Sequence, residues 1–403
     1  MKRLKMILSD FRESLGANLV LLFVMTAVIF LFLYTYGQYR FSTHNYNVLR
    51  KNLSNFVYFE DFVIDFGGKE SYRETMEVVN QINDFDAVKT AYYYLGTEGF
   101  LGDLRCNVSV YNEDIRKLCP EPEKGEWFTQ GKNEDGSFNV VVAGSDFYNA
   151  KVGSEYTFYI GLPGTEQVEV KIRICGVMGF PSYFPSFSGG GTFVGANKLF
   201  TPGDCIIFDN EAIQSIIDAR PEMFHGSMNR IVEFEPDASE EEIEECLQYF
   251  SSRGTYHDEE EILNQSREDL AYFFKTAMLF PLFLLFTAGL TFLSISTLSV
   301  YKKIDKQAVY YLVGCSKKRI LADVLIQIGI VSFVSGLLNI LFALSYSFLR
   351  AKQIILMDNV LFDSQVIWVT IGILLFIYAL TAMTVVLILR KKSPVALLRK
   401  FEN

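Results

Sequence analysis

Four long runs of apolar residues interrupt an otherwise polar sequence, one near the amino terminus and three in the last third. An α-helix needs roughly 20 residues to cross about 30 Å of hydrocarbon, and each run reaches that length. The runs are residues 18–36, 273–300, 324–349 and 366–389. We therefore predict four transmembrane helices. Buried helices of a soluble protein are the alternative, which runs of this length and purity disfavour.

The first run predicts an uncleaved helix and not a signal peptide. A signal peptide has a shorter apolar core and ends in small residues, whereas this run ends in an aromatic segment with Tyr34 and Tyr36. Paired aromatic residues are typical of a membrane interface.

Charge predicts the orientation of the helices. About 15 Lys and Arg residues lie in three segments, 2–12, 301–319 and 390–400, where acids are few. Residues 38–271 hold about 40 acids and 19 bases. Because cytoplasmic segments of membrane proteins are rich in Lys and Arg, we expect both termini in the cytoplasm and residues 38–271 outside, in a cell membrane.

The inserted segment has the pattern of a mixed α and β domain. Residues 168–174 alternate apolar and charged side chains, as a strand with one wet face does. Residues 71–82 have helical spacing and precede a strand pattern at 87–92. Ser239 and Glu242 form a capping box ahead of an acidic helix. Two α+β lobes account for this pattern.

The predicted fold is a membrane protein with four transmembrane α-helices and a large extracytoplasmic α+β domain inserted between helices 1 and 2. Its parts are the cytoplasmic amino terminus with helix 1 (1–37), the extracytoplasmic domain (38–271), helix 2 (272–300), a cytoplasmic loop (301–320), helix 3 (321–350), a short outer loop (351–365), helix 4 (366–390) and a cytoplasmic tail (391–403).

Two segments of the insert have features of their own. From residue 258 a helical pattern continues into the second apolar run, which predicts a stiff helical rod between the domain and the membrane. Residues 180–203 are rich in aromatic residues, Pro, Gly and Ser. They read as a long exposed loop that either touches a ligand or folds back onto its own lobe.

Sites for chemistry are scarce. The sequence has no phosphate loop, no H-E-x-x-H and no G-x-S-x-G. His44, His225 and His257 are the three histidines, and we expect them to be surface residues and not metal ligands. Five of the six cysteines fall in the insert, where bridges and buried free thiols both remain open: Cys106, Cys119, Cys175, Cys205 and Cys246. We expect no catalytic site, no metal and no cofactor on this chain.

The loop between helices 2 and 3 is where the sequence resembles a known family. It is similar to the loop of FtsX-like, MacB-type ABC transporter permeases, in which an apolar helix ends in Leu-Gly-Ala-Ser followed by bases and Ile. Here Gly314, Ser316 and Ile320 match, while Gln307 and Cys315 depart from the family's Glu and Ala. The residues assigned to ATPase coupling by this resemblance are Lys306, Gln307, Val309, Tyr310, Leu312, Gly314, Ser316, Lys317 and Ile320.

The tail and the insert extend the resemblance. Pro394, Leu398 and Arg399 match the family's Pro-x-x-x-Leu-Arg ending. The patterns at 125–128, 140–144, 152–153 and 174–177 follow the order of the family's outside core domain.

The resemblance implies a permease subunit that binds no nucleotide itself and pairs with a separate ABC ATPase, which carries ATP and Mg²⁺. A second permease copy, identical or related, would complete the complex in the lipid bilayer, and an extracytoplasmic ligand or protein would be its outside partner. ATP hydrolysis would drive a conformational change of the outside domain, for export or extraction of a peptide, lipoprotein or antibiotic. No nucleic acid is expected.

Two alternatives remain at this point. One is an FtsX-type regulator of cell-wall hydrolases, and the other is a membrane-tethered receptor or sensor without an ATPase. The sequence does not identify the substrate, the direction of action or the identity of the second permease.

Overall fold

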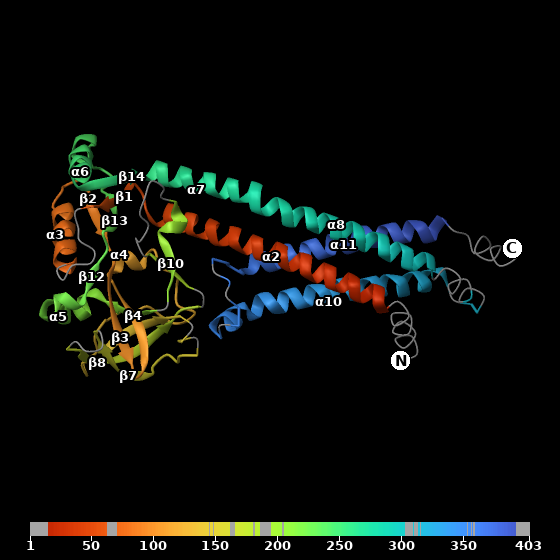
Figure 1. The fold of residues 1–403 in the computed structure, drawn as a ribbon, viewed down its shortest axis with the longest axis horizontal. Coiled ribbons are helices and arrows are strands. Elements are labelled where there is room, and N and C mark those ends of the chain that lie inside the picture. Colours follow the sequence, from red (N-terminus) through yellow and green to blue (C-terminus); the bar gives the residue numbers. More distant parts are fainter. Residues whose placement is uncertain are drawn as a thin grey trace. The chain divides into compact units, whose positions relative to one another are not determined.

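The protein forms two compact units in this computed structural model, which describes residues 15–62, 71–144, 146–147, 149–161, 166–179, 182–185, 195–203, 205–302, 309, 313–314, 316–352, 354–355, 357 and 359–391 (Figure 1). The membrane unit comprises residues 1–40, 272–346 and 360–403, and the inserted unit comprises 41–271 and 347–359.

Four helices in the structure are long and apolar enough to cross a membrane, which confirms the four predicted spans. They are Leu15–Asn52, Glu259–Lys302, Leu321–Ala351 and Ser364–Ile388. The first span is helix α2 (Leu15–Asn52), and the second comprises α7 (Glu259–Phe273), a π-helical turn (Phe274–Met278) and α8 (Leu279–Lys302). The third and fourth lie in α10 (Lys317–Ala351) and α11 (Ser364–Lys391).

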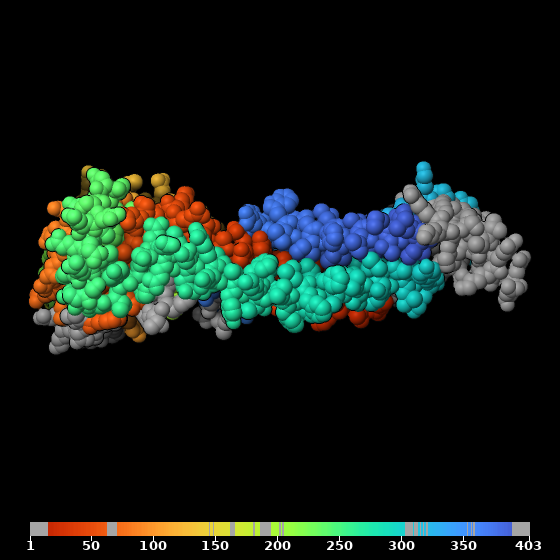
Figure 2. Space-filling model, turned by 90° about the horizontal axis from the view of Figure 1, so that it is seen from above, coloured from red at the N-terminus to blue at the C-terminus, as the bar shows by residue number. Residues whose placement is uncertain are grey.

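The helices of the membrane unit share one apolar core. Along α2, Leu21, Met25, Ile29 and Leu33 recur every four residues and are buried. This spacing places them on one face of the helix, where they pack with Phe292 of α8 and with residues of α10 and α11. Helices α8 and α11 lie against each other (Figure 2).

One end of this bundle is fastened by polar contacts between α2 and the start of α11. The Arg40 guanidinium donates to Asp363 at 2.6 and 3.1 Å. The same carboxylate accepts from the backbone N–H of Val366 at 3.0 Å and so caps α11. The backbone N–H of Leu361 donates to the carbonyl of Gly37, where a Cβ would meet Val360 at 2.6 Å. Glycine thus permits a close approach of the backbones.

The smaller sheet of the inserted unit has the strand order β14-β1-β13-β2 and is antiparallel throughout. Its strands are β1 (Phe56–Asp61), β2 (Val88–Tyr92), β13 (Asn229–Phe234) and β14 (Gly254–Asp258). Helices α3 (Ser71–Asn83) and α6 (Glu240–Arg253) cover one face, where their apolar residues join a core with Val57, Phe59 and Val232.

The larger sheet closes on itself. Its main path is β12-β3-β4-β11-β6-β8-β5, and β7 pairs with both β3 and β8, so that β3, β4, β11, β6, β8 and β7 form a ring. The strands are β3 (Leu95–Leu101), β4 (Leu104–Tyr111), β5 (Lys124–Gly125), β6 (Phe138–Ala143), β7 (Glu155–Ile160), β8 (Val168–Val177), β11 (Cys205–Asp209) and β12 (His225–Gly226). Pairs β4–β11 and β6–β8 are parallel. The ring encloses a core that includes Val108, Phe158 and Phe208, and helix α5 (Asn210–Ala219) contributes Ile213 and Ile217.

Several local predictions for the insert are confirmed. The alternating segment at 168–174 lies in β8, the helical pattern at 71–82 is α3, and the strand pattern at 87–92 contains β2. Ser239 and Glu242 form the predicted capping box at the start of α6. The two lobes correspond to the two sheets, each with its own core.

The segment 180–203 folds back onto its own unit where the structure describes it. Phe180, Pro181 and the glycines at 189–191 lie outside the described residues. Strands β9 (Tyr183–Pro185) and β10 (Phe200–Pro202) pair with each other, and Tyr183 and Phe184 are buried. The ring of Tyr183 lies 4.2 Å from that of Phe41. Of the two readings left open, the described part supports the folded-back loop.

All five cysteines of the insert are free thiols in the structure. Burial raises the pKa of Cys106 and Cys175 to about 11, because the thiolate loses solvation in an apolar environment. These cysteines therefore act as small apolar core residues.

The first and last strands of the small sheet are neighbours. Val57 lies opposite Asp258 in the β1–β14 pair, and the N–H of Asn55 donates to Glu259 at 2.7 Å. Helix α2 precedes β1 and helix α7 follows β14, so the two helical arms leave the sheet side by side (Figure 1). Arg267 of α7 donates to the hydroxyl of Tyr46 of α2 at 2.9 Å.

We expect replacement of Ser239 by Ala to weaken α6 by about 1 kcal/mol, because the first turn loses its side-chain acceptor. Hydrogen exchange of the α6 amides in the full-length protein should become about fivefold faster. The matched control is Ser251→Ala in the last turns of the same helix, where the hydroxyl only bonds back to the carbonyl of Leu247. Equal exchange in the two variants would contradict the role of the cap.

Candidate functional site

The segment between α8 and α10 is the candidate coupling site, and its described residues show how it is built. Helix α8 ends at Lys302, and α10 begins at Lys317. Between them the N–H of Val313 donates to the carbonyl of Val309 at 3.1 Å, which is the bond of one helical turn. The segment therefore contains a short helical element before α10.

The Gly-x-Ser motif marks a helix end and a helix start. Gly314 has φ of +90°, a left-handed conformation that strains any residue with a Cβ. Ser316 then begins the next helix, since its carbonyl and its hydroxyl accept from the N–H of Arg319 at 3.0 and 3.4 Å. The motif is thus a stop signal followed directly by a start signal.

The short element exposes apolar side chains. Val309 is 50% exposed and Val313 is 80% exposed. Residues four apart lie on the same face of a helix, so the two valines form one exposed apolar patch. Lys318 and Arg319, both exposed, lie close by in sequence at the start of α10. An apolar patch bordered by bases is suited to contact with an acidic protein groove.

The other predicted coupling residues are described in part or not at all. Lys317 and Ile320 lie in the first turn of α10, and only their backbone is described. Lys306, Gln307, Tyr310 and Leu312 lie outside the described residues. The tail motif, Pro394, Leu398 and Arg399, also lies outside them. The roles of these residues stay predictions.

Sequence reasoning missed a group of polar contacts inside the membrane unit. The hydroxyl of Thr26 on α2 donates to that of Ser335 on α10 at 3.2 Å, and the Asn339 amide donates to the carbonyls of Thr26 and Ser335. Ser335 and Asn339 are buried. The spacing of Ser335 and Asn339, four residues apart in an apolar run, was the signal available in the sequence.

A second polar position lies in the same unit. Asn18, Ser296, Ser299 and Gln327, from α2, α8 and α10, line a cavity of about 30 Å³. A space of this size with several polar groups can hold one water molecule. Together with Asn339 it shows that the interior of the bundle is not purely apolar.

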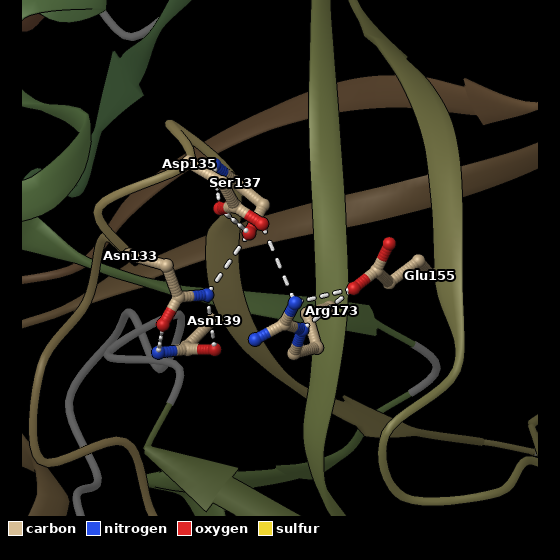
Figure 3. A network of polar contacts seen from close by, with 6 residues as sticks. All are labelled: Asn133, Asp135, Ser137, Asn139, Glu155 and Arg173. Atoms are coloured by element: carbon tan, nitrogen blue, oxygen red, sulfur yellow. Dashed lines mark hydrogen bonds and ion pairs between the residues drawn. The ribbon is translucent and has the colours of Figure 1, made fainter.

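A polar network on the larger sheet has the oxygen-bearing residues of a cation site but not its free ligands. Asn133, Asp135, Ser137 and Asn139 carry oxygen-bearing side chains at alternate positions (Figure 3). Their groups bond one another instead. Ser137 donates its hydroxyl and its N–H to Asp135, which holds the pKa of that carboxyl below its usual range, and Arg173 reaches both Asp135 and Glu155. The network fastens a turn to β8.

Histidines and acids make no metal site among the residues that the structure describes. His257 pairs with Glu261 at 3.0 Å, one helical turn away, and its side chain is largely buried at 13% exposure. Burial lowers the pKa of His225. Both histidines are therefore partly buried and not fully exposed.

Comparison with known proteins gives a match to a family model and similarity to solved structures. Residues 278–394 match the FtsX-like permease C-terminal family. No curated protein matches the chain. Among solved structures, the extracellular domain of the noncanonic ABC-type transporter YknZ from Gram-positive bacteria is similar at 10% identity and a TM-score of 0.27, covering 51% of this chain and 98% of that one.

The matched region contains α8, α10 and α11 and the exposed segment between α8 and α10. The similarity to the FtsX-like permease C-terminal family therefore covers the last three predicted spans and the segments between them.

Proposed function

We propose that this chain is the transmembrane subunit of an ABC transporter that passes mechanical change from a separate cytoplasmic ATPase to its inserted domain. The observation that carries the proposal is the exposed apolar pair Val309 and Val313, placed between two spans inside the family-matched region. A soluble subunit that binds this patch would bury it and would pull directly on α8 and α10.

The charge of the flanking residues supports docking to an acidic groove. Lys302, Lys318 and Arg319 are exposed. Valine side chains supply the buried contact area of such an interface, while the bases at its rim select an acidic partner and speed association. A loop that only lies on anionic lipid would use the same bases and would not need the valines.

The route outward runs through continuous helices. The second span continues through α7 to the small sheet, and the first continues in α2 to the same sheet. A helix moves as a stiff element over a few turns. Displacement of α8 by the ATPase would therefore reach the strands β1 and β14, on which the inserted domain is built.

The remaining parts of the complex follow from the same proposal. ATP and Mg²⁺ bind to the partner and not to this chain, and a second permease copy, identical or related, takes up the second ATPase. The chain lies in the cell membrane with both termini in the cytoplasm and the inserted unit outside. Its outside ligand is a peptide, lipoprotein or antibiotic that is extracted or exported.

We expect the double substitution Val309→Asp with Val313→Asp to reduce co-purification of the ATPase from native membranes at least tenfold, because two carboxylates would be placed against an acidic groove. The control is Val152→Asp, at a valine of the inserted unit that is 45% exposed. It should leave the yield of the complex unchanged. Undiminished co-purification of the double variant would contradict the assigned contact.

We expect a membrane-impermeant maleimide applied to intact cells to label Val152→Cys and not Val313→Cys. Both positions are exposed in the structure, so the difference reports the side of the membrane. After the membrane is permeabilised, Val313→Cys should become reactive as well. Labelling of Val313→Cys in intact cells would overturn the proposed orientation.

A further inference from the structure

The second span contains one turn that is not α-helical. Residues Phe274–Met278 form a π-helix between α7 and α8, and among the described helices it is the one π segment. It lies next to the boundary between the two compact units, which falls between Ala271 and Tyr272. The helix that was predicted to be a stiff rod is thus continuous. It has one widened turn, close to the residue at which one unit ends and the other begins.

Two local features sustain this turn. Pro281 has no N–H, and its ring excludes the carbonyl of Ala277, so the α-helical bond between these residues cannot form. The hydroxyl of Thr276 donates to the carbonyl of Tyr272 at 2.8 Å, the group that the Thr276 N–H would bond in an α-helix. Pro281 and Thr276 therefore favour the π turn. They do not prevent the residues between the turn and α7 from forming an α-helical turn.

The π turn also affects the rotation of the helix about its axis. A π turn takes up one more residue than an α turn. Conversion to an α turn would rotate the helix on one side of this turn against the other side by roughly 100° and shift it by about 1.5 Å.

Tyr39 of α2 contacts the helix at this turn. The centre of its ring lies 6.5 Å from that of Phe273, in a stacked arrangement, and 6.2 Å from that of Phe274, in an edge-on arrangement. Tyr39 is itself held in place, because the next residue, Arg40, is bound to Asp363 of α11. Phe273 is the last residue of α7 and Phe274 is the first residue of the π turn. Rotation of the helix there would therefore change how the two phenylalanine rings contact Tyr39.

We propose that the π turn Phe274–Met278 is a two-state element that converts to an α turn when the ATPase acts, and thereby changes the rotation of α7 relative to α8. The inference rests on the proposed function for its driving force and on the geometry of the turn for its location. A change of one residue in helix phase is a discrete step between two forms of the turn.

The test uses the full chain with its co-purified ATPase in lipid nanodiscs, without nucleotide and after incubation with Mg²⁺, ATP and vanadate, which traps ADP with vanadate in the ATPase. Hydrogen exchange of the amides at 272–280 is the readout. We expect exchange to slow about tenfold on trapping, since an α turn bonds these amides better than a π turn. The variant Thr276→Val with Pro281→Ala removes both features that sustain the π turn, and its exchange should be slow in both states while the ATPase still co-purifies.

The matched control is Thr291→Val. The Thr291 hydroxyl donates to the carbonyl four residues earlier, as Thr276 does, but in the regular part of α8. This variant should behave as the unmodified protein does. Equal exchange of the unmodified protein in the two states, or an unchanged rate in the double variant, would overturn the switch.

Failure of the proposed function gives a different result. If no ATPase co-purifies with the unmodified chain, the transporter assignment fails. The comparison of the unmodified chain with the double variant then still decides whether the turn has two accessible forms, and equal exchange rates would reject it.

Discussion

The pairing of β1 with β14 is the contact on which the arrangement of the inserted unit depends. These strands come from opposite ends of the insert, yet they lie side by side in one sheet. Helix α2 therefore ends where α7 begins, and Arg267 and Tyr46 join the two arms. The short helix Ala196–Lys198 strengthens this junction, because Asn197 bonds Ser42 and Asn45 of α2 while the N–H of Ala196 donates to Ser266 of α7.

A second constraint acts in the membrane unit. The absence of water in hydrocarbon requires each backbone polar group to find its partner within the helices. Among the described residues of the four long helices, the π turn Phe274–Met278 departs from a regular α-helix, and there the Thr276 hydroxyl supplies a bond to the backbone. Thr26, Ser335 and Asn339 form hydrogen bonds across α2 and α10.

The sequence predicted what depends on local periodicity and missed what depends on distant contacts. The four spans, strand β8 and the Ser239 cap were predicted because apolar spacing and cap residues are local signals. The closed ring of strands was not predicted, since the pairing of β7 with both β3 and β8 leaves no local pattern. The π turn was missed for a related reason, because a proline near a helix start, such as Pro281, is compatible with a regular helix.

The candidate site shows the same difference between features with a local sequence signal and features without one. The positive φ of Gly314 and the helix start at Ser316 explain in physical terms why the motif has this form. The exposure of Val309 and Val313 could not be read from the sequence, because apolar residues beside a membrane span are buried in protein or lipid in most contexts. No local pattern in the sequence indicated the partial burial of His225 and His257.

The small sheet pairs the first strand of the insert with the last, which has a consequence for biogenesis. Strand β1 is buried along its whole length, but both of its neighbours are made from residues after 228. Strand β4 can pair with the preceding strand β3, but its parallel partner β11 comes about 100 residues later. During synthesis β1 therefore lacks both of its strand partners until nearly the entire insert has emerged, and pairing between such distant segments is a slow folding step.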